Sequence, residues 1–415
     1  MKVEFSMKFK YIILFLFIFN FVCFGQKFEN QIFKVEFLYG DILKHTPRVV
    51  PLIQGPVIGG EVAVEFQTMG ERAWHQYLNY PVVGLGATWF NLGNPVMLGQ
   101  AFAFYPYINF PLLKSKVLKF SIKAGAGLSF VTKNYYNTNT DSLGNLLPGL
   151  NGTNAAIGSV VNVYLTGGAN FTFSLGHGFS LAAEYNWNHI SNGNIATPNA
   201  GLNFLNSMIG IRYCPNENKQ FERKHKLFAD LPRKFSTELT FYGGMRSLYY
   251  LDHQLFPVGA VAFSLSRPLV NFYQMGLGID AFYDGVYGAV YISRKNPLNT
   301  TQYGFTYITE DQLINKIRIG VSWQHEIILG KLTAGFHVGL YLFNPIKNLE
   351  PFDQASTKQL NKPLIYPYNI EKESGWFYSQ AILKYSISRH FLVSVGLKTH
   401  LQKAEFIEWG LGYKF

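Results

Sequence analysis

Short stretches in which apolar and polar residues alternate recur along most of this chain. In one of them Leu181 and Trp187 share one face, whereas Glu184 and Asn188 share the other. Because successive side chains of a β-strand point to opposite sides, a period of two predicts a strand with one apolar face. The predicted strands of the first half cover residues 31–40, 58–68, 79–90, 98–109, 116–133, 158–175, 178–190 and 204–213.

The second half of the chain repeats this pattern. Its predicted strands cover residues 235–248, 257–267, 271–284, 314–328, 332–344, 375–387, 390–400 and 405–415. A very short turn precedes the seventh strand of each half, at 176–178 and 388–390, and the final strands end alike, on Tyr213 and Phe415. A last strand ending in an aromatic residue resembles the signal that closes outer-membrane barrels. We therefore predict an all-β protein of two tandem eight-stranded antiparallel transmembrane barrels. One sixteen-stranded barrel is the alternative, because sixteen strands at this spacing would also close.

Residues 214–233 interrupt the alternation between the two halves. They are polar and charged and contain Pro215 and Pro232, which predicts a linker. The expected barrels then occupy residues 26–213 and 234–415. Because barrels of this class place long loops outside the cell and short turns in the periplasm, the linker is expected to be periplasmic. By the same rule, the strand over 178–190 ends at the outer surface.

Composition and the N-terminus agree with an exported membrane protein. Aromatic residues make up 17% of the chain and charged residues only 15%, as expected for an outer-membrane β-barrel. Lysines precede an apolar run over 11–24, which predicts a signal peptide over 1–25 with cleavage after Gly25. After cleavage Cys214 is the remaining cysteine, so no intramolecular disulfide is expected.

The chain carries a formal net charge of +11. This charge fits contact with anionic lipid head groups, or basic residues that populate the periplasmic turns and linker. No nucleic-acid motif is present, and export argues against a nucleic-acid partner. The histidines outside residues 184–213 lack metal-ligand spacing.

Three polar residues continue the apolar faces of neighbouring strands. By parity, His189 and Ser191 follow Trp187 on its face, and Asn203 lies on the apolar face of the next strand. A base, a hydroxyl and an amide thus converge at the rim of an apolar surface, where an enzyme acting on lipid would need them. A His and a Ser two residues apart on a strand also occur by chance.

The wider motif makes this pattern specific. The sequence His189-Ile-Ser191-Asn192, followed by Pro198-Asn199-Ala-Gly201-Leu-Asn203, resembles the outer-membrane lipid A 3-O-deacylase family. The resemblance covers the first half of the chain. It implies an acyloxyacyl hydrolase-like barrel in the bacterial outer membrane that removes an ester-linked acyl chain from lipid A. The implied partners are lipopolysaccharide and outer-membrane lipids, a homodimer is compatible with it, and no cofactor or metal is implied.

The resemblance also implies roles for individual residues. Ser191 matches the nucleophile, His189 the general base, and Asn199 an oxyanion-hole residue supported by Asn192. Asn203 stands where the family commonly has a catalytic Glu. From the residues alone, Asn199 could equally cap the loop, and Asn192 could simply form a turn.

The amide at position 203 leaves the activity open. Asn203 can accept a hydrogen bond from the imidazole but carries no charge. In a serine protease the change from acid to amide lowers kcat by about 10⁴. We therefore expect a slow hydrolase, a hydrolase using another acid, or a barrel without catalysis. Glu184 is a poor substitute because by parity it points into the barrel.

The second half is expected to lack the motif. Aligning Phe179 with Phe391 places Leu401 at the position of His189 and Lys403 at that of Ser191, with His400 on the opposite face. A single active site is therefore expected at most. The competing functions are a non-catalytic binding, adhesion or structural barrel, and a transport pore, which would require one wide barrel.

Overall fold

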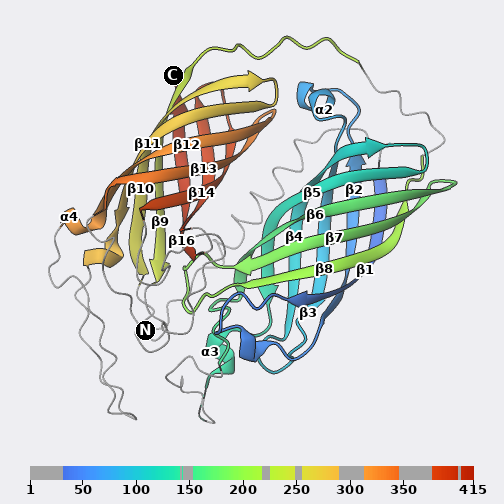
Figure 1. Ribbon diagram of the computed structural model, residues 1–415, viewed down its shortest axis with the longest axis horizontal. Helices are drawn as coiled ribbons and strands as arrows, with labels where there is room; N and C mark the ends of the chain where they lie inside the picture. Colours follow the sequence, from blue (N-terminus) through green and yellow to red (C-terminus); the bar gives the residue numbers. More distant parts are fainter. Residues whose placement is uncertain are drawn as a thin grey trace.

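The computed structural model describes residues 31–140, 143, 153–216, 225–247, 255–288, 313–344, 376–400 and 403–415. The strands of these segments form two separate closed barrels in which every neighbouring pair is antiparallel (Figure 1). The first barrel contains β1 (Gln31–Ile42), β2 (Val57–Gln67), β3 (Val82–Asn91), β4 (Gln100–Lys114), β5 (Leu118–Val131), β6 (Val161–Gly176), β7 (Phe179–Ser191) and β8 (Leu202–Tyr213). The second contains β9 (Ser236–Ser247), β10 (Leu255–Val270), β11 (Tyr273–Asp284), β12 (Ile317–Leu329), β13 (Leu332–Phe343), β14 (Phe377–Ser386), β15 (Phe391–His400) and β16 (Lys403–Lys414).

Each half closes on itself through its own first and last strands. β1 pairs with β8 in the first barrel, and β9 pairs with β16 in the second. The prediction of two tandem barrels is therefore confirmed, and the alternative of one sixteen-stranded barrel is wrong. Because each half closes separately, the two halves do not form the single wide barrel that the transport-pore alternative requires.

The predicted strands agree with the observed ones in order and approximate extent, with the largest difference at β4. This strand continues to Lys114, beyond the predicted end at residue 109. Its pairing with β5 shifts register between Pro111 and Leu113. Proline cannot donate to the ladder and is accommodated at such a bulge, so it does not end the strand.

Polar side chains fill the interior of the first barrel. Glu184 faces inward as predicted, and its carboxylate lies 2.5 Å from the Lys34 ammonium and 2.9 Å from that of Lys123. Lys34 also lies 2.7 Å from Glu36 and 3.1 Å from Glu61. Opposite charges paired in this way are the arrangement in which buried charges are tolerated.

The second barrel has an interior of the same kind. Lys384 lies 2.7 Å from Glu238 and 2.8 Å from Glu326. Nearer the other end, Arg318 contacts Asp284 at 3.2 Å and Glu405 at 2.6 Å. Eight-stranded barrels are narrow enough for side chains to fill them, and both barrels are filled.

The outer walls are apolar. Outward-facing residues such as Phe37, Tyr185, Ile209 and Trp409 are more than half exposed on the isolated chain. An outside of apolar and aromatic side chains around a polar inside is the pattern of barrels that span an outer membrane.

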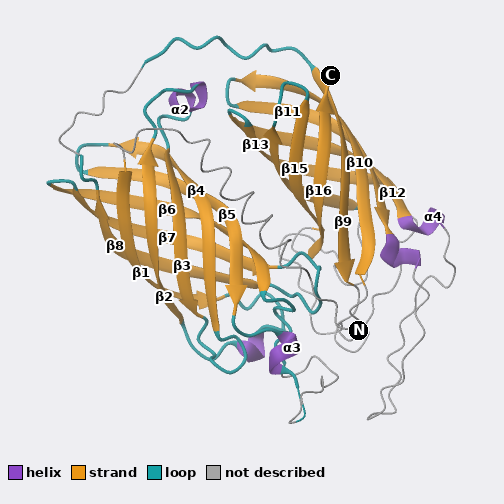
Figure 2. Cartoon of the chain, turned by 180° about the vertical axis from the view of Figure 1, so that it is seen from behind, coloured by secondary structure: helices purple, strands orange, loops and turns teal. Residues whose placement is uncertain are grey.

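Short helical segments lie at the barrel ends (Figure 2). They are η2 (Val50–Leu52), α2 (Ala73–Tyr77), α3 (Tyr135–Thr138), η3 (Gly285–Gly288) and α4 (Leu313–Lys316). No helix in the described part of the chain is long and apolar enough to cross a membrane. The predicted signal peptide over 1–25 lies outside the described residues, as does part of the predicted linker, residues 217–224.

Candidate active site

The end of β7 carries a hydrogen-bonded histidine and serine. His189 Nε2 lies 2.8 Å from the Ser191 hydroxyl oxygen. Residues 182, 184, 186, 188 and 190 are buried in the barrel interior, so the odd-numbered positions between them face outward. By this alternation His189 and Ser191 lie on the outer side of the wall at the end of the strand, where His189 is partly exposed and Ser191 is buried beneath its neighbours.

Asn203 completes a line of three polar side chains. The register of β7 and β8 places it directly opposite His189. Its side-chain oxygen lies 2.7 Å from His189 Nδ1. Because that oxygen can only accept, Nδ1 carries the ring proton and leaves Nε2 to accept the hydroxyl proton of Ser191. The three residues that the sequence singled out are thus brought together in the order expected of a nucleophile, a base and a residue that orients the base.

The connection between β7 and β8, residues 192–201, is called here the site loop. Within it the Asn199 side-chain oxygen accepts a hydrogen bond from the backbone N–H of Asn192, 3.1 Å away. This bond turns the Asn199 NH2 group toward the Asn194 side-chain oxygen, 3.5 Å away. Asn192 and Asn199 therefore lie next to Ser191 and contact each other, which fits an oxyanion-binding loop as well as a turn.

A second segment of the first barrel, residues 153–160, holds the site loop in place. The backbone N–H groups of Ala200 and Gly201 donate hydrogen bonds to the backbone oxygens of residues 155 and 156, over 3.2 and 2.9 Å respectively. The Asn192 side chain donates to the Ser159 hydroxyl, 2.8 Å away. These bonds support both ends of the loop from one side.

Two neighbours of the site were not singled out as such by the sequence. The Trp187 ring stacks on the His189 ring, with centroids 5.8 Å apart and planes 10° apart. His45, in the connection after β1, has its Nε2 atom 3.2 Å from the carbonyl oxygen of Ala200. Nothing in the local sequence around His45 indicates this long-range approach.

At the corresponding place in the second barrel, only residues 401–402 separate β15 from β16. β15 ends at His400, which pairs with Lys403, the first residue of β16. The alignment of Lys403 with Ser191 is therefore wrong in structural terms, because Lys403 already belongs to the next strand. His400 faces the barrel interior as expected, and its Nε2 lies 3.0 Å from the Glu405 carboxylate.

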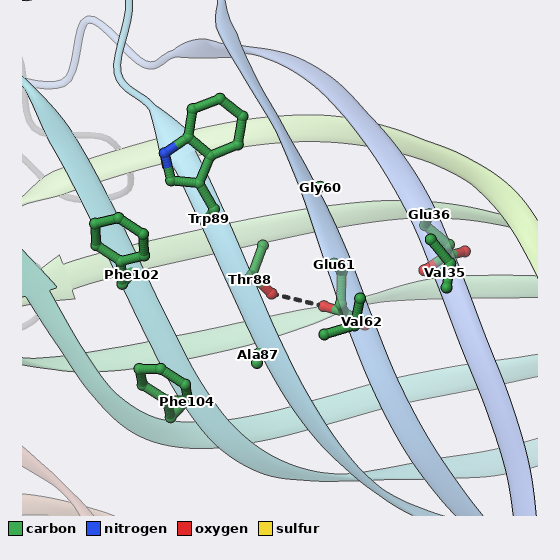
Figure 3. A pocket seen from close by; sticks show the side chains of 10 residues that line it. All are labelled: Val35, Glu36, Gly60, Glu61, Val62, Ala87, Thr88, Trp89, Phe102 and Phe104. Carbon is green, nitrogen blue, oxygen red and sulfur yellow. Dashed lines mark hydrogen bonds between the residues drawn. The ribbon is translucent and has the colours of Figure 1, made fainter.

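The candidate site does not coincide with the hollow drawn in Figure 3, a depression of about 310 Å³ in the outer wall formed by β1 to β4. Small residues, Gly60 and Ala87, form its floor among larger apolar side chains such as Trp89 and Phe102. The bond from Thr88 to Glu61 in that view belongs to the interior side of the wall. Among the described residues, no group of three or more His, Cys, Asp or Glu side chains could hold a metal ion.

The closed barrels with apolar outer walls and charged interiors define an outer-membrane β-barrel protein. Residues 58–212 match the family model described as lipid A 3-O-deacylase (PagL). Residues 235–357 and 365–415 match a separate model, described as the acyloxyacyl hydrolase C-terminal domain. The first barrel is thus covered by the model of the lipid A 3-O-deacylases, a family of hydrolases, and the second barrel is covered by the model of an acyloxyacyl hydrolase C-terminal domain.

The remaining comparisons concern individual proteins. A search of curated proteins finds no match. Among solved structures, Neisserial surface protein A is 9% identical, with a TM-score of 0.30, over 44% of this chain and 96% of its own. The outer membrane enzyme PagL is 14% identical, with a TM-score of 0.28, over 43% of this chain and 98% of its own. The P. putida toluene transporter TodX is 11% identical, with a TM-score of 0.18, over 93% of this chain and 90% of its own.

Proposed function

We propose that this protein is a serine esterase that removes the 3-O-linked acyl chain of lipid A in the outer leaflet of the outer membrane. The observation that carries the proposal is the continuous hydrogen-bonded line from Ser191 through His189 to Asn203 on the outer wall of the first barrel. This line stands in the domain that matches the lipid A deacylase model.

The reaction follows from the positions of these atoms. His189 Nε2 takes the Ser191 hydroxyl proton as the serine oxygen attacks the acyl carbonyl carbon. When the tetrahedral intermediate collapses, the imidazolium returns that proton to the sugar oxygen, which leaves as a hydroxyl. Water, deprotonated by His189, then attacks the acyl-enzyme, releasing the fatty acid and restoring Ser191.

The site loop supplies the proposed oxyanion contacts. The amide NH2 of Asn199 is the donor proposed to receive the negative oxygen, and the backbone N–H of Asn192 fixes its orientation through the 3.1 Å bond to the Asn199 side-chain oxygen. One such donor contributes about 10²–10³ in kcat.

The acyl chains are proposed to lie along the outer wall beside the site. Tyr185 and Trp187 of β7 and Ile209 of β8 are exposed there and present apolar surface. A chain in this position exchanges lipid neighbours for protein neighbours, so the ester reaches the strand end without leaving the apolar layer.

The test is mass spectrometry of lipid A from cells that express the full-length chain. Wild-type protein is expected to remove one acyl chain, and Ser191→Ala none. Ser207→Ala is the matched control, because Ser207 is an exposed serine on the outward side of β8. It should retain wild-type activity.

The mass of the released group identifies which ester is cleaved, including a secondary acyloxyacyl ester. Unchanged lipid A in cells with correctly inserted wild-type protein would contradict the proposal and favour a non-catalytic barrel. Activity that survives Ser191→Ala would show that another nucleophile acts.

A further inference from the structure

The site loop contacts the second barrel as well as its own. The Asn194 side chain donates to the backbone oxygen of Ala404, at the start of β16, over 2.5 Å. The Asn194 backbone oxygen accepts from the N–H of Ser247, at the end of β9, over 2.7 Å. The hydroxyl groups of Thr197 and Ser247 lie 3.0 Å apart. Figure 1 shows the end of β7 reaching toward the start of β16.

The backbone of the loop is shaped for this contact. Gly193 and Asn194 have φ angles of +59° and +63°, the left-handed region that glycine and asparagine tolerate best. A Cβ atom on Gly193 would overlap the side chain of Ile407 and lie 3.4 Å from Leu397 Cδ1. Ile407 and Leu397 face each other on β16 and β15, so the loop rests on the outer wall of the second barrel where β16 begins.

Hydrogen bonds continue from this contact to the site. Asn194, held by the second barrel, accepts from the Asn199 NH2 group over 3.5 Å. Asn199 in turn accepts from the backbone N–H of Asn192, the residue that follows Ser191. A line of neutral amides thus joins β16 to the residues proposed to bind the oxyanion.

The first half of the chain also contacts the linker segment and the second barrel away from the site. The Tyr80 hydroxyl lies 3.1 Å from Nδ1 of His225, in the segment that joins the barrels. An added Cβ on Gly330, between β12 and β13, would lie 3.3 Å from the Trp74 indole of α2. Contacts at separate places limit rotation of one barrel against the other.

We propose that the second barrel is a positioning element for the active site. Through Asn194 it holds the site loop, and thereby Asn199 and Asn192, in the geometry that receives the oxyanion. This inference rests on the proposed function, since it concerns the efficiency of that reaction. It explains why a barrel without a site loop of its own accompanies the deacylase domain.

The first test replaces Asn194 in the full-length protein. Asn194→Gly preserves the left-handed backbone and removes the side chain, whereas Asn194→Asp can still accept from Asn199 but can no longer donate to Ala404. Both variants are expected to lower kcat on purified lipid A in mixed micelles by about tenfold, with little change in KM. The reason is that a small misplacement of the oxyanion donors weakens their hydrogen bonds to the transition state but not the binding of the substrate.

The second test changes only the second barrel. Ile407→Trp enlarges the side chain against Gly193 and is expected to lower kcat to a similar extent. Ile279→Trp is its matched control, because Ile279 is an exposed isoleucine on the outer wall of β11. It should leave kcat unchanged. The folded fraction, measured by the mobility shift of unheated barrels on a gel, normalises each rate, so a merely structural loss does not lower kcat.

A third measurement tests the contact without using activity. In a Cys214→Ser background, Thr197→Cys and Ser247→Cys together are expected to form a disulfide on mild oxidation, and the linked protein should keep its kcat. No cross-link, or full kcat in both Asn194 variants and in Ile407→Trp, would overturn this inference. If the cysteine pair cross-links but wild-type protein leaves lipid A intact, the proposed function is overturned instead, and the positioning role with it.

Discussion

At the scale of single residues, Asn203 governs what His189 can do. Its side-chain oxygen faces His189 Nδ1 and so selects the tautomer in which Nε2 can act as a base. It supplies no negative charge to stabilise the imidazolium that forms during attack. Glu184 cannot supply that charge, because it lies inside the barrel between Lys34 and Lys123.

A carboxylate at position 203 should therefore accelerate the reaction. Asn203→Asp keeps the length of the side chain and places a charged oxygen where the amide oxygen lies 2.7 Å from the ring. We expect kcat to rise by a factor of about 10² or more. This is less than the factor of roughly 10⁴ in kcat by which a serine protease with the acid exceeds its amide variant. The measurement is lipid A hydrolysis by the purified variant.

The double variant Ser191→Ala with Asn203→Asp is the control, and it should be inactive. An unchanged or lower kcat in the single variant would show that the imidazolium already has another charged partner.

Residue-scale predictions from the sequence succeeded where strand parity governs position. The alternation placed His189, Ser191 and Asn203 on one outer face, and the observed register brings them together. His45 and Asn194 escaped notice because their contacts depend on loops that meet from distant parts of the chain, and alternation carries no information about loops.

At the scale of elements, the site depends on how closely the site loop packs against the end of β7. Gly201 has a φ angle of +75°, and an added Cβ would lie 3.1 Å from His189 Cε1 and 3.6 Å from Ser191 Cβ. The loop can follow this path because glycine occupies the position.

Gly201→Ala should therefore impair catalysis. Both backbone strain, of about 1–2 kcal/mol, and crowding of the imidazole are expected, and displacement of the base should lower kcat by about tenfold. The measurement pairs the rate of lipid A hydrolysis with the thermal unfolding temperature.

Gly176→Ala is the matched control for this change. Gly176 has a φ angle of +88°, and an added Cβ meets nothing within 4 Å. This variant should show the lower thermal unfolding temperature that backbone strain causes, but its kcat should stay at the wild-type value. Equal losses of kcat in both variants would mean that strain alone, rather than contact with His189, is responsible.

The order of the elements was predictable, whereas their ends were less so. The alternation of apolar and polar residues predicted every strand. It did not predict that β4 extends through Pro111, where a bulge accommodates the proline. The second-barrel alignment failed at Lys403 for a similar reason, since the alternation does not reveal that Lys403 already pairs with His400 as part of the next strand.

At the scale of the whole molecule, two filled barrels stand side by side. Tyr107, Lys34 and Lys123 are nearly inaccessible inside the first barrel, and Arg318 and Lys398 inside the second. The sequence predicted the two barrels from their repeated strands and endings. It could not predict how they touch, because the residues at the contact are small or neutral and lie in loops or on outer walls that look alike.

Filled interiors predict that the protein does not conduct ions. Full-length protein reconstituted into planar bilayers should produce no stepwise current at voltages where a general porin, used as the positive control, produces clear steps. The physical reason is that eight strands enclose too little space for water once side chains occupy it. Stepwise conductance that scales with the amount of protein would contradict the packing of the interiors.

The outward direction of His189 and Ser191 has a consequence for kinetics. A lipid that reaches them from the surrounding leaflet is found by diffusion in two dimensions, and the second barrel blocks part of the perimeter from which it can arrive. The relevant concentration is then the number of substrate molecules per area of membrane. Dilution of the substrate with inert lipid should slow the enzyme, even when the total amounts of enzyme and substrate in the sample stay constant.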